Sequence, residues 1–204
     1  MKPSTRYHHG DLRAAIIRSA MAALERDGPE GISLRGLAET VNVSRSAPYS
    51  HFRNKREVMA AIAEIGFDRL IDEMQRVDGD APDARLCFLG VGAGYIRFAL
   101  ENPGLFKLMF SADLVSLRSV GDLDQRSARA YAVFRQSLDA FLLEIGRAAP
   151  ASPTLQALAW SSVHGLAMLL LEDRLPGPPE RPMDLAHAVT GMFVELIESS
   201  AQRA

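Results

Sequence analysis

The stretch from residue 33 to residue 55, SLRGLAETVNVSRSAPYSHFRNK, constrains the fold of this chain more than any other. Its first half carries an apolar stripe at helical spacing that begins at Leu34, and Ser33 is a residue type that caps helix starts. Asn42 tolerates the left-handed conformation of a tight turn, and a second short helix is predicted from Ser44 to about residue 52. On spacing alone, this pattern is typical either of a DNA-binding helix-turn-helix or of an ordinary helical hairpin in a core.

The distribution of charge separates these two interpretations. The whole chain has a formal net charge of −2. Residues 1–56 contain ten basic and five acidic side chains, whereas the remainder contains 13 basic and 20 acidic ones. A module of net charge +5 on a body of net charge −7 is suited to a polyanion at one end only. The charge pattern therefore favours DNA binding by the N-terminal module.

Composition indicates an ordinary folded protein. Apolar residues make up 48% of the 204 residues, and the single cysteine, Cys87, excludes an intramolecular disulfide and fits a reducing compartment. The first residues, MKPSTRYHHGDLR, lack the apolar core of a signal peptide. The longest apolar tract, near residues 155–171, is interrupted by polar residues and is shorter than the ~20 residues of a membrane span. We therefore expect a cytoplasmic protein without a membrane partner.

The rest of the chain shows helical periodicity and no strand pattern, which predicts an all-α fold. We expect a three-helix N-terminal domain over residues 1–56 and a helical C-terminal domain over residues 57–204. Before the first helix, residues 2–8 form either an arm for the DNA minor groove or a disordered tail. Helices are predicted over residues 11–27, 33–41, 44–52, 54–74, 85–101, 103–109, 122–148 and 183–200, with a loop over residues 111–121. Another predicted helix contains Trp160 and ends at residue 175.

Groups for catalysis or metal binding are sparse. The five histidines show no metal-ligand spacing with Cys, Asp or Glu, and no set of nucleophile, base and orienting group can be assembled. The glycines of residues 90–94 lie inside a helical pattern, where they favour either close helix packing or space for a bound molecule. Cys87 lies on the most apolar helix and is an inert thiol on this pattern. We expect no catalytic residue, no metal and no cofactor, and hence no enzyme.

Several residue strings resemble the TetR family of bacterial transcription regulators. They are residues 7–13 (YHHGDLR), 33–35 (SLR) and 47–55 (APYSHFRNK). Residues 101–106 (ENPGLF) and 160–165 (WSSVHG) resemble the subgroup named for a Trp-His-Gly C-terminal domain. The resemblance implies a homodimer with a DNA-binding head and a ligand-sensing body that pairs its last two helices across the dimer axis.

The resemblance also implies residue roles in the head. Arg45, Ser46 and Ala47 are the expected base readers, since Arg pairs with guanine and Ala touches a thymine methyl. Arg35 either reaches the DNA or is a solvated charge. Pro48 lies inside the recognition helix, and close relatives tend to carry Arg where this chain has Ser50. The expected DNA-binding set is Ser33, Arg35, Ser44, Arg45, Ser46, Ala47, Tyr49, Ser50, His51 and Lys55.

Expected roles in the body divide into an effector pocket and a dimer seam. For Trp160 and His164, on one helix face, the alternatives are a packed core pair or a lining of the cavity or seam. The expected effector-binding set, mostly apolar, is Tyr95, Phe98, Phe106, Met109, Phe134, Phe141, Trp160 and His164. The expected dimer-interface set is Leu166, Leu170, Leu185, Val189, Met192, Phe193 and Leu196.

These roles together predict a dimeric repressor that leaves a palindromic DNA operator when a small apolar effector binds. The alternative is a constitutive or architectural DNA-binding protein without an effector.

Overall fold

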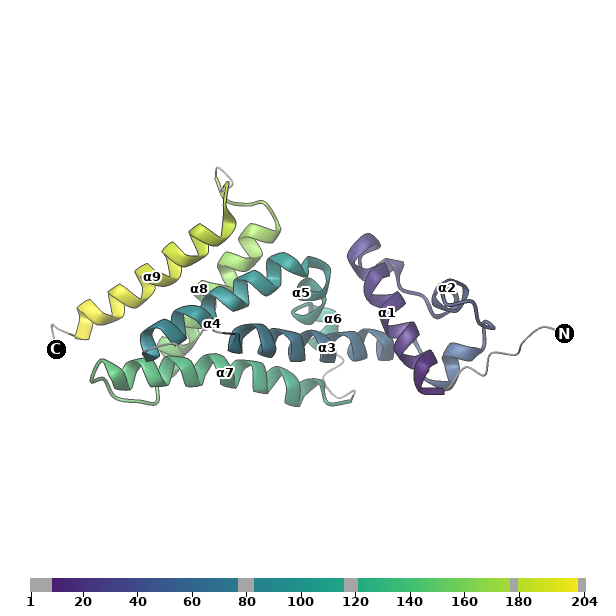
Figure 1. Cartoon of the computed structure of the whole chain (residues 1–204), viewed down its shortest axis with the longest axis horizontal. Helices are drawn as coiled ribbons and strands as arrows, with labels where there is room; N and C mark the ends of the chain where they lie inside the picture. Colours follow the sequence, from purple (N-terminus) through teal and green to yellow (C-terminus); the bar gives the residue numbers. More distant parts are fainter. Residues whose placement is uncertain (1–8, 77–82, 116–120, 177–179, 202–204) are drawn as a thin grey trace. The chain divides into compact units, whose positions relative to one another are not determined.

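The computed structural model describes residues 9–76, 83–115, 121–176 and 180–201 (Figure 1). Over these ranges the chain is helical and contains no strand, which confirms the predicted all-α fold. The expected arm at residues 2–8 lies outside the described residues. The elements are α1 (His9–Asp27), η1 (Pro29–Gly31), α2 (Leu34–Thr40), η2 (Ala47–Ser50), α3 (Lys55–Gln75), α4 (Ala84–Glu101), α5 (Pro103–Met109), α6 (Ala112–Val115), α7 (Leu123–Glu144), α8 (Pro153–Leu171) and α9 (Pro182–Ala201).

The chain divides into two compact units. Unit 1 comprises residues 1–66 and 104–124, and unit 2 comprises residues 67–103 and 125–204. Helix α3 contributes its first part to unit 1 and the rest to unit 2. The expected boundary after residue 56 divides the chain by function and stays a prediction.

Unit 1 is organised around α1. This helix packs against α2 and η2, and its inward face buries Ile16, Ala20 and Leu24. Leu37 and Ala38 of α2 are equally buried, so the stripe expected from the sequence is the core of this small module. The buried α1–α2 contact gives the recognition segment a firm support.

Unit 2 is organised around α4, which packs against both α8 and α9 (Figure 1). Its glycines explain part of this close packing. A Cβ added at Gly94 would lie 2.6 Å from the carbonyl oxygen of Glu73 in α3. Any side chain there would force the two helices apart, so Gly94 follows the packing interpretation.

Several helix ends differ from their predicted positions. Helix α7 ends at Glu144 rather than residue 148, because Gly146 (φ 74°) closes it with bonds from Arg147 N–H to the Leu142 carbonyl (2.8 Å) and from its own N–H to Leu143 (3.1 Å). Helix α8 ends at Leu171 rather than residue 175, and Asp173 (φ 51°) takes the same role there. The predicted loop at 111–121 contains the single turn α6.

Candidate functional site

Helix α2 is closed by a local interaction at each end. The Ser33 hydroxyl accepts a hydrogen bond from the Gly36 N–H at 3.1 Å, as expected for a helix cap. At the other end Asn42 adopts φ 55°, while the Val43 N–H bonds to the Ala38 carbonyl at 3.0 Å. This left-handed closure ends α2 and turns the chain towards the recognition segment.

The recognition segment differs from its prediction. It forms a 3-10 turn over Ala47–Ser50 rather than an α-helix from residue 44 to residue 52. Pro48 has no N–H, and the N–H groups of Ala47 and Tyr49 bond three residues back, at 3.0 and 3.1 Å. Ser44 does not cap this turn; its hydroxyl lies 3.2 Å from that of Ser46.

Two buried side chains anchor the recognition segment to the core of unit 1. Pro48 is buried, and Phe52 is 2% exposed. The guanidinium of Arg13 in α1 lies 5.2 Å from the centre of the Phe52 ring. These contacts hold one side of the segment and leave its other side to solvent.

The expected DNA-binding side chains lie mostly on that solvent side. Tyr49 is 56% exposed, so more than half of this large ring is open to solvent. The half-buried members are Ala47, His51 and Lys55, and the exposed members are Ser33, Arg35, Ser44, Arg45, Ser46, Tyr49 and Ser50. The Ser50 hydroxyl donates to the Ala47 carbonyl at 2.7 Å. The fold therefore brings the whole expected set onto one small module.

Acidic residues that the sequence interpretation missed lie among these cations. The Glu39 carboxylate is 3.1 Å from Arg45 Nη2 and 3.8 Å from Arg35 Nε. Glu30 Oε2 is 3.5 Å from Lys55 Nζ. The spacing of Arg35 and Glu39, four residues apart on α2, could have signalled the first contact. The other two depend on turns and had no signal in the sequence.

The expected effector-binding residues divide between the two units. Phe106 and Met109 belong to unit 1, where α5 packs closely on α3: a Cβ added at Gly66 would lie 2.5 Å from Met109 Sδ. Glu25 of α1 fixes the start of α5 by accepting hydrogen bonds from the N–H groups of Gly104 (3.0 Å) and Leu105 (2.9 Å).

The other expected residues belong to unit 2, where most of them surround one aromatic cluster. The Tyr95 hydroxyl lies 2.9 Å from His164 Nδ1. The Trp160 ring packs edge-on against Tyr95 (5.1 Å between centroids) and Phe134 (5.3 Å). Phe141 and Phe98 are also buried in unit 2, and Phe141 stacks on Phe88 at 5.7 Å. The structure thus joins six of the eight expected residues within one unit.

Burial sets the protonation state of the polar pair in this cluster. It raises the pKa of the Tyr95 hydroxyl well above its ordinary value and lowers the pKa of His164. Both side chains are therefore neutral near pH 7. A neutral hydrogen-bonded pair costs less to bury than a charged one, which fits a packed aromatic environment.

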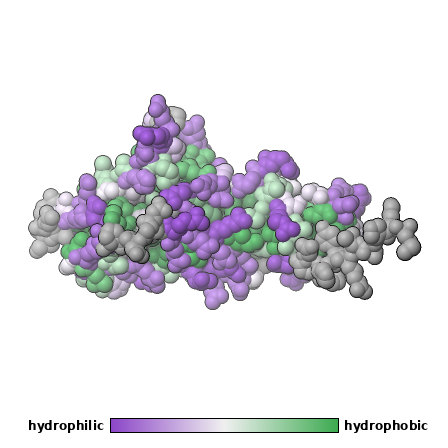
Figure 2. All heavy atoms as spheres, in the orientation of Figure 1, coloured by the Kyte–Doolittle hydropathy of each residue, from purple (hydrophilic) through white to green (hydrophobic). Residues whose placement is uncertain are grey.

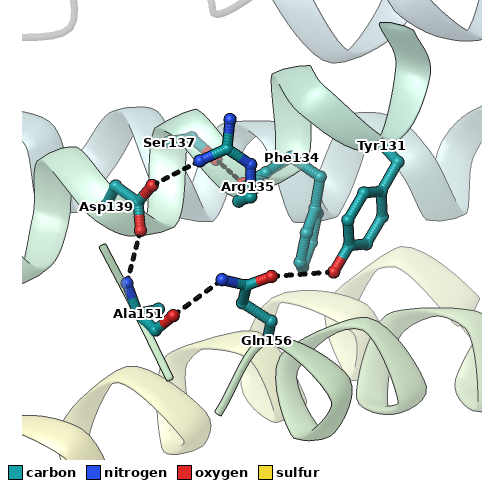
Figure 3. A network of polar contacts seen from close by, with 7 residues as sticks. All are labelled: Tyr131, Phe134, Arg135, Ser137, Asp139, Ala151 and Gln156. Carbon is teal, nitrogen blue, oxygen red and sulfur yellow. Dashed lines mark hydrogen bonds and ion pairs between the residues drawn. The ribbon is translucent and has the colours of Figure 1, made fainter. Parts of the chain in front are cut away.

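A polar network braces the helix that carries Trp160 (Figure 3). The Tyr131 hydroxyl of α7 donates to Gln156 at 3.2 Å, and the Gln156 amide donates to the Ala151 carbonyl at 2.7 Å. The Ala151 N–H donates to Asp139 at 2.7 Å, and Arg135 pairs with the same carboxylate at 3.0 Å. The network joins α7 to the start of α8, and so fixes the position of the aromatic cluster.

A small hollow lies between α4, α7, α8 and α9. Phe88, Gly92 and Phe193 are among its lining residues. Ser162 and Thr190 also line it, but each hydroxyl donates to a carbonyl of its own helix, at 2.8 and 2.9 Å. The lining is therefore apolar in effect. Phe134, a member of the expected effector-binding set, is among the residues that line the hollow.

The outer face of α8 and α9 exposes large apolar side chains. Leu158 (57%), Leu169 (40%), Met192 (64%) and Leu196 (63%) are exposed. Of the expected dimer set, Met192 and Leu196 lie on this face, Leu166 is 6% exposed and packs within unit 2, and Leu170, Leu185, Val189 and Phe193 are half-buried. Figure 2 shows hydrophilic residues over most of the face drawn, with smaller hydrophobic areas between them.

Helix α8 is long and apolar enough, by length and composition, to cross a membrane. Its most apolar window has a mean hydropathy of 1.3, and 22% of that window is buried within the chain. Helices at the core or subunit interface of helical proteins meet the same criterion, and α8 packs on α4 and α9. Among the described residues, no group of three His, Cys, Asp or Glu is placed to hold a metal ion.

Comparisons with known proteins agree with this arrangement. Residues 88–193 match the family model of the tetracyclin repressor-like C-terminal domain, and residues 16–62 match that of bacterial regulatory proteins of the tetR family. The nucleoid occlusion factor SlmA of Escherichia coli O1:K1 / APEC is 31% identical over 133 residues, which are 62% of this chain and 65% of SlmA. The class C tetracycline repressor of Escherichia coli is 46% identical over 52 residues, which are 26% of this chain and 24% of the repressor.

The chain aligns with less than two thirds of the length of these curated relatives. A solved structure gives wider coverage. A protein of unknown function from Rhodococcus sp. RHA1 is 28% identical and has a TM-score of 0.78, covering 94% of this chain and 98% of that one.

The two matched regions bear directly on function. The N-terminal match contains the whole of α2 and η2, which confirms the helix-turn-helix and its role in DNA binding. The C-terminal match alone covers more than half of the chain. Regulators of this kind are DNA-binding proteins rather than enzymes. The chain therefore belongs to the TetR family of bacterial transcription regulators.

Proposed function

We propose that this regulator is a dimeric repressor that leaves a palindromic operator when a small apolar effector binds to unit 2. The observation that carries the DNA-reading part is the recognition segment. Its Pro48 and Phe52 are buried in the module, while Arg45, Ser46 and Tyr49 extend into solvent. A segment held from behind presents its outer side chains to the major groove in a fixed register.

Within this segment the base readers are Arg45, Ser46 and Ala47, because they lie at its exposed start. Arg45 pairs with guanine through two N–H groups, and Ala47 contacts a thymine methyl. Ser44 and Arg35 lie beside them. The phosphate contacts come from Ser33, Tyr49, Ser50, His51 and Lys55, which fix the register without reading sequence. The Ser50 hydroxyl donates to the Ala47 carbonyl at 2.7 Å, so it must rotate to donate to a phosphate.

The outer face of α8 and α9 is the proposed dimer interface. Four large apolar side chains are exposed there, and a Cβ added at Gly165 or Gly191 would meet nothing within 4 Å. Exposed apolar side chains beside glycines suit the close approach of partner helices. We expect the two recognition segments of the dimer to bind about 34 Å apart, one turn of DNA.

The proposed effector site is the aromatic part of unit 2. It includes Tyr95, Phe98, Phe134, Phe141, Trp160 and His164, and leaves out Phe106 and Met109, whose side chains pack in unit 1. The side chains that line the hollow beside Phe134 are apolar, which supports an uncharged, hydrophobic effector over a charged one. The neutral Tyr95–His164 pair is the polar element within reach of the cluster.

Two further assignments rest on the same residues. The strings around Trp160, His164 and Gly165 support membership of the Trp-His-Gly subgroup. DNA binding by a bacterial regulator supports a cytoplasmic location, where the chromosome lies.

A constitutive or architectural DNA-binding protein is the second candidate. The similarity to SlmA, which is named as a nucleoid occlusion factor, is compatible with that role without favouring it.

Thermal shift against a panel of uncharged apolar metabolites tests the repressor proposal. We expect at least one compound to raise the melting temperature of the protein and also to release it from a duplex obtained by binding-site selection. A ligand that binds only the folded state must stabilise it, by an amount that grows with ligand concentration. Specific DNA binding that no stabilising compound reverses would instead support the constitutive candidate.

A further inference from the structure

We propose that Glu39 is a specificity-determining residue, which holds Arg45 in position for a guanine and opposes its use on phosphate. This inference rests on the proposed role of Arg45 as a base reader. The ionised Glu39 carboxylate has no hydrogen-bond donor to offer a phosphate, so Glu39 acts through Arg45.

The geometry comes from the turn of the helix-turn-helix. Glu39 lies in the last turn of α2, and its backbone carbonyl accepts the N–H of Asn42 at 3.2 Å. The left-handed Asn42 then reverses the chain and returns Arg45 to the end of α2. There the carboxylate of Glu39 lies 3.1 Å from Arg45 Nη2. The turn with its left-handed Asn42 thus brings the two side chains together.

Both side chains of the Glu39–Arg45 ion pair are open to solvent. The Glu39 side chain is 57% exposed, and the Arg45 side chain is 63% exposed. An ion pair so open to water adds little to folding stability. What it does fix is the direction of a long side chain that would otherwise sample many rotamers. Its effect therefore belongs to recognition rather than to stability.

Arginine chemistry permits both contacts at once. The guanidinium has five N–H donors in a planar fork, and a guanine occupies two of them. The Glu39 carboxylate can keep another donor while the fork faces the base. On an operator with guanine at this position, Arg45 therefore binds with less loss of side-chain freedom.

Charge works in the opposite direction on other sequences. Non-specific binding depends on cations that neutralise phosphates. Without a guanine, Arg45 gains most by turning to a phosphate, and Glu39 both competes for it and repels the phosphate. Arg35 lies farther from the same carboxylate, at 3.8 Å, so the competition falls mainly on Arg45. Glu39 therefore weakens non-specific complexes more than the specific one.

Glu30 provides a matched comparison on the same module. It is 96% exposed and pairs with Lys55 at 3.5 Å. Lys55 is proposed to contact phosphate on every sequence, so Glu30 should weaken all complexes equally. Variants of the two acids therefore distinguish the positioning of a base-reading arginine from a general effect of negative charge on DNA binding.

The test compares Glu39→Gln with Glu30→Gln in the full-length protein. Dissociation constants are measured by fluorescence anisotropy on the duplex selected by the wild type and on a scrambled duplex, over a range of salt concentrations. We expect Glu39→Gln to tighten binding to the scrambled duplex by several-fold and binding to the selected duplex by less. The dissociation constant for the scrambled duplex divided by that for the selected duplex should therefore fall on the order of fivefold. Glu30→Gln should tighten both duplexes by the same factor.

Two further variants exclude a general charge effect. Glu39→Asp keeps the charge but shortens the reach, so it should also lower the ratio. In an Arg45→Ala background, Glu39→Gln should lower the ratio no further, because the residue acts through Arg45. An unchanged ratio in Glu39→Gln, or an equal loss in the Arg45→Ala background, would overturn the inference. An Arg45→Ala variant with unchanged sequence preference would instead refute the proposed base reader.

Discussion

The helix-turn-helix of unit 1 and the aromatic cluster of unit 2 use side chains in opposite ways. In unit 1 the side chains proposed to contact DNA are mostly exposed and rest on a small buried frame of Leu37, Ala38 and Phe52. In unit 2 most of the proposed effector-binding side chains are part of the core: Tyr95 and Phe134 are at most 1% exposed, whereas Trp160 and His164 are half-buried. A change at the first surface should therefore alter DNA binding and spare stability, whereas a change in the cluster should affect stability first.

The largest expected effect tests this contrast with two aromatic residues. Phe134→Ala should lower the free energy of unfolding by about 3–5 kcal/mol, because it leaves a cavity among packed rings. Tyr49→Ala, which removes a 56% exposed ring, should change it by about 0.5 kcal/mol or less and instead weaken DNA binding. Guanidinium denaturation followed by circular dichroism measures both. Equal losses of stability would contradict the division between surface and core.

The next effect concerns the turn that supports the surface. Asn42 has φ 55°, and a β-branched residue fits that conformation poorly, so Asn42→Val should cost about 1–2 kcal/mol of stability. Asn42→Gly is the control, because glycine adopts a positive φ without strain and should leave stability nearly unchanged. Thermal unfolding of both variants would decide. Similar melting temperatures for Val and Gly would show that the turn does not need a left-handed residue.

A smaller effect is expected at the proposed phosphate contact of Lys55. Lys55→Ala should weaken binding by about threefold to tenfold on every duplex and reduce the salt slope by about one. Arg56→Ala is the control for position, because Arg56 is the next residue of α3 and its loss changes the net charge by the same amount. Binding isotherms on selected and scrambled duplexes give the comparison. A loss confined to the selected duplex would make Lys55 a base reader.

The smallest effect concerns pH and the buried cluster. The folded-state pKa of His164 is lowered by burial, so the unfolded chain binds a proton more readily. The contribution of this group to stability is therefore complete above the ordinary histidine pKa of about 6.5, and is lost as the pH falls below it. We expect His164→Asn to be less sensitive to acid than the wild type, and exposed His187→Gln to behave like the wild type. Unfolding free energies at several pH values would measure this, and equal pH dependence in all three proteins would exclude the histidine.

Sequence periodicity was sufficient for the helical fold and the apolar stripes, because both depend on local spacing. The 3-10 form of residues 47–50 was missed, although Pro48 was visible, because the result depends on which N–H groups find partners. The C-terminal ends of α7 and α8 depend on single residues with positive φ, Gly146 and Asp173. An aspartate is only a weak sequence signal for a helix end.

Long-range contacts explain the remaining differences in the candidate site. The sequence singled out Tyr95, Trp160 and His164 by residue type, and the fold brings them together. It also grouped them with Phe106 and Met109, which pack in the other unit. Aromatic or apolar character alone does not indicate in which unit a residue packs. The pairing of Glu39 with Arg45 was equally invisible, since a turn rather than a helical spacing creates it.

The most direct test of the account is binding-site selection with the purified wild type and Arg45→Ala. The wild type should select a palindrome whose half-sites lie one helical turn apart, and the variant should retain that palindrome but lose preference at one base position in each half-site. The loss should be worth roughly 1–3 kcal/mol of discrimination. An identical selected sequence and affinity for both proteins would contradict the assignment of this segment as the DNA reader.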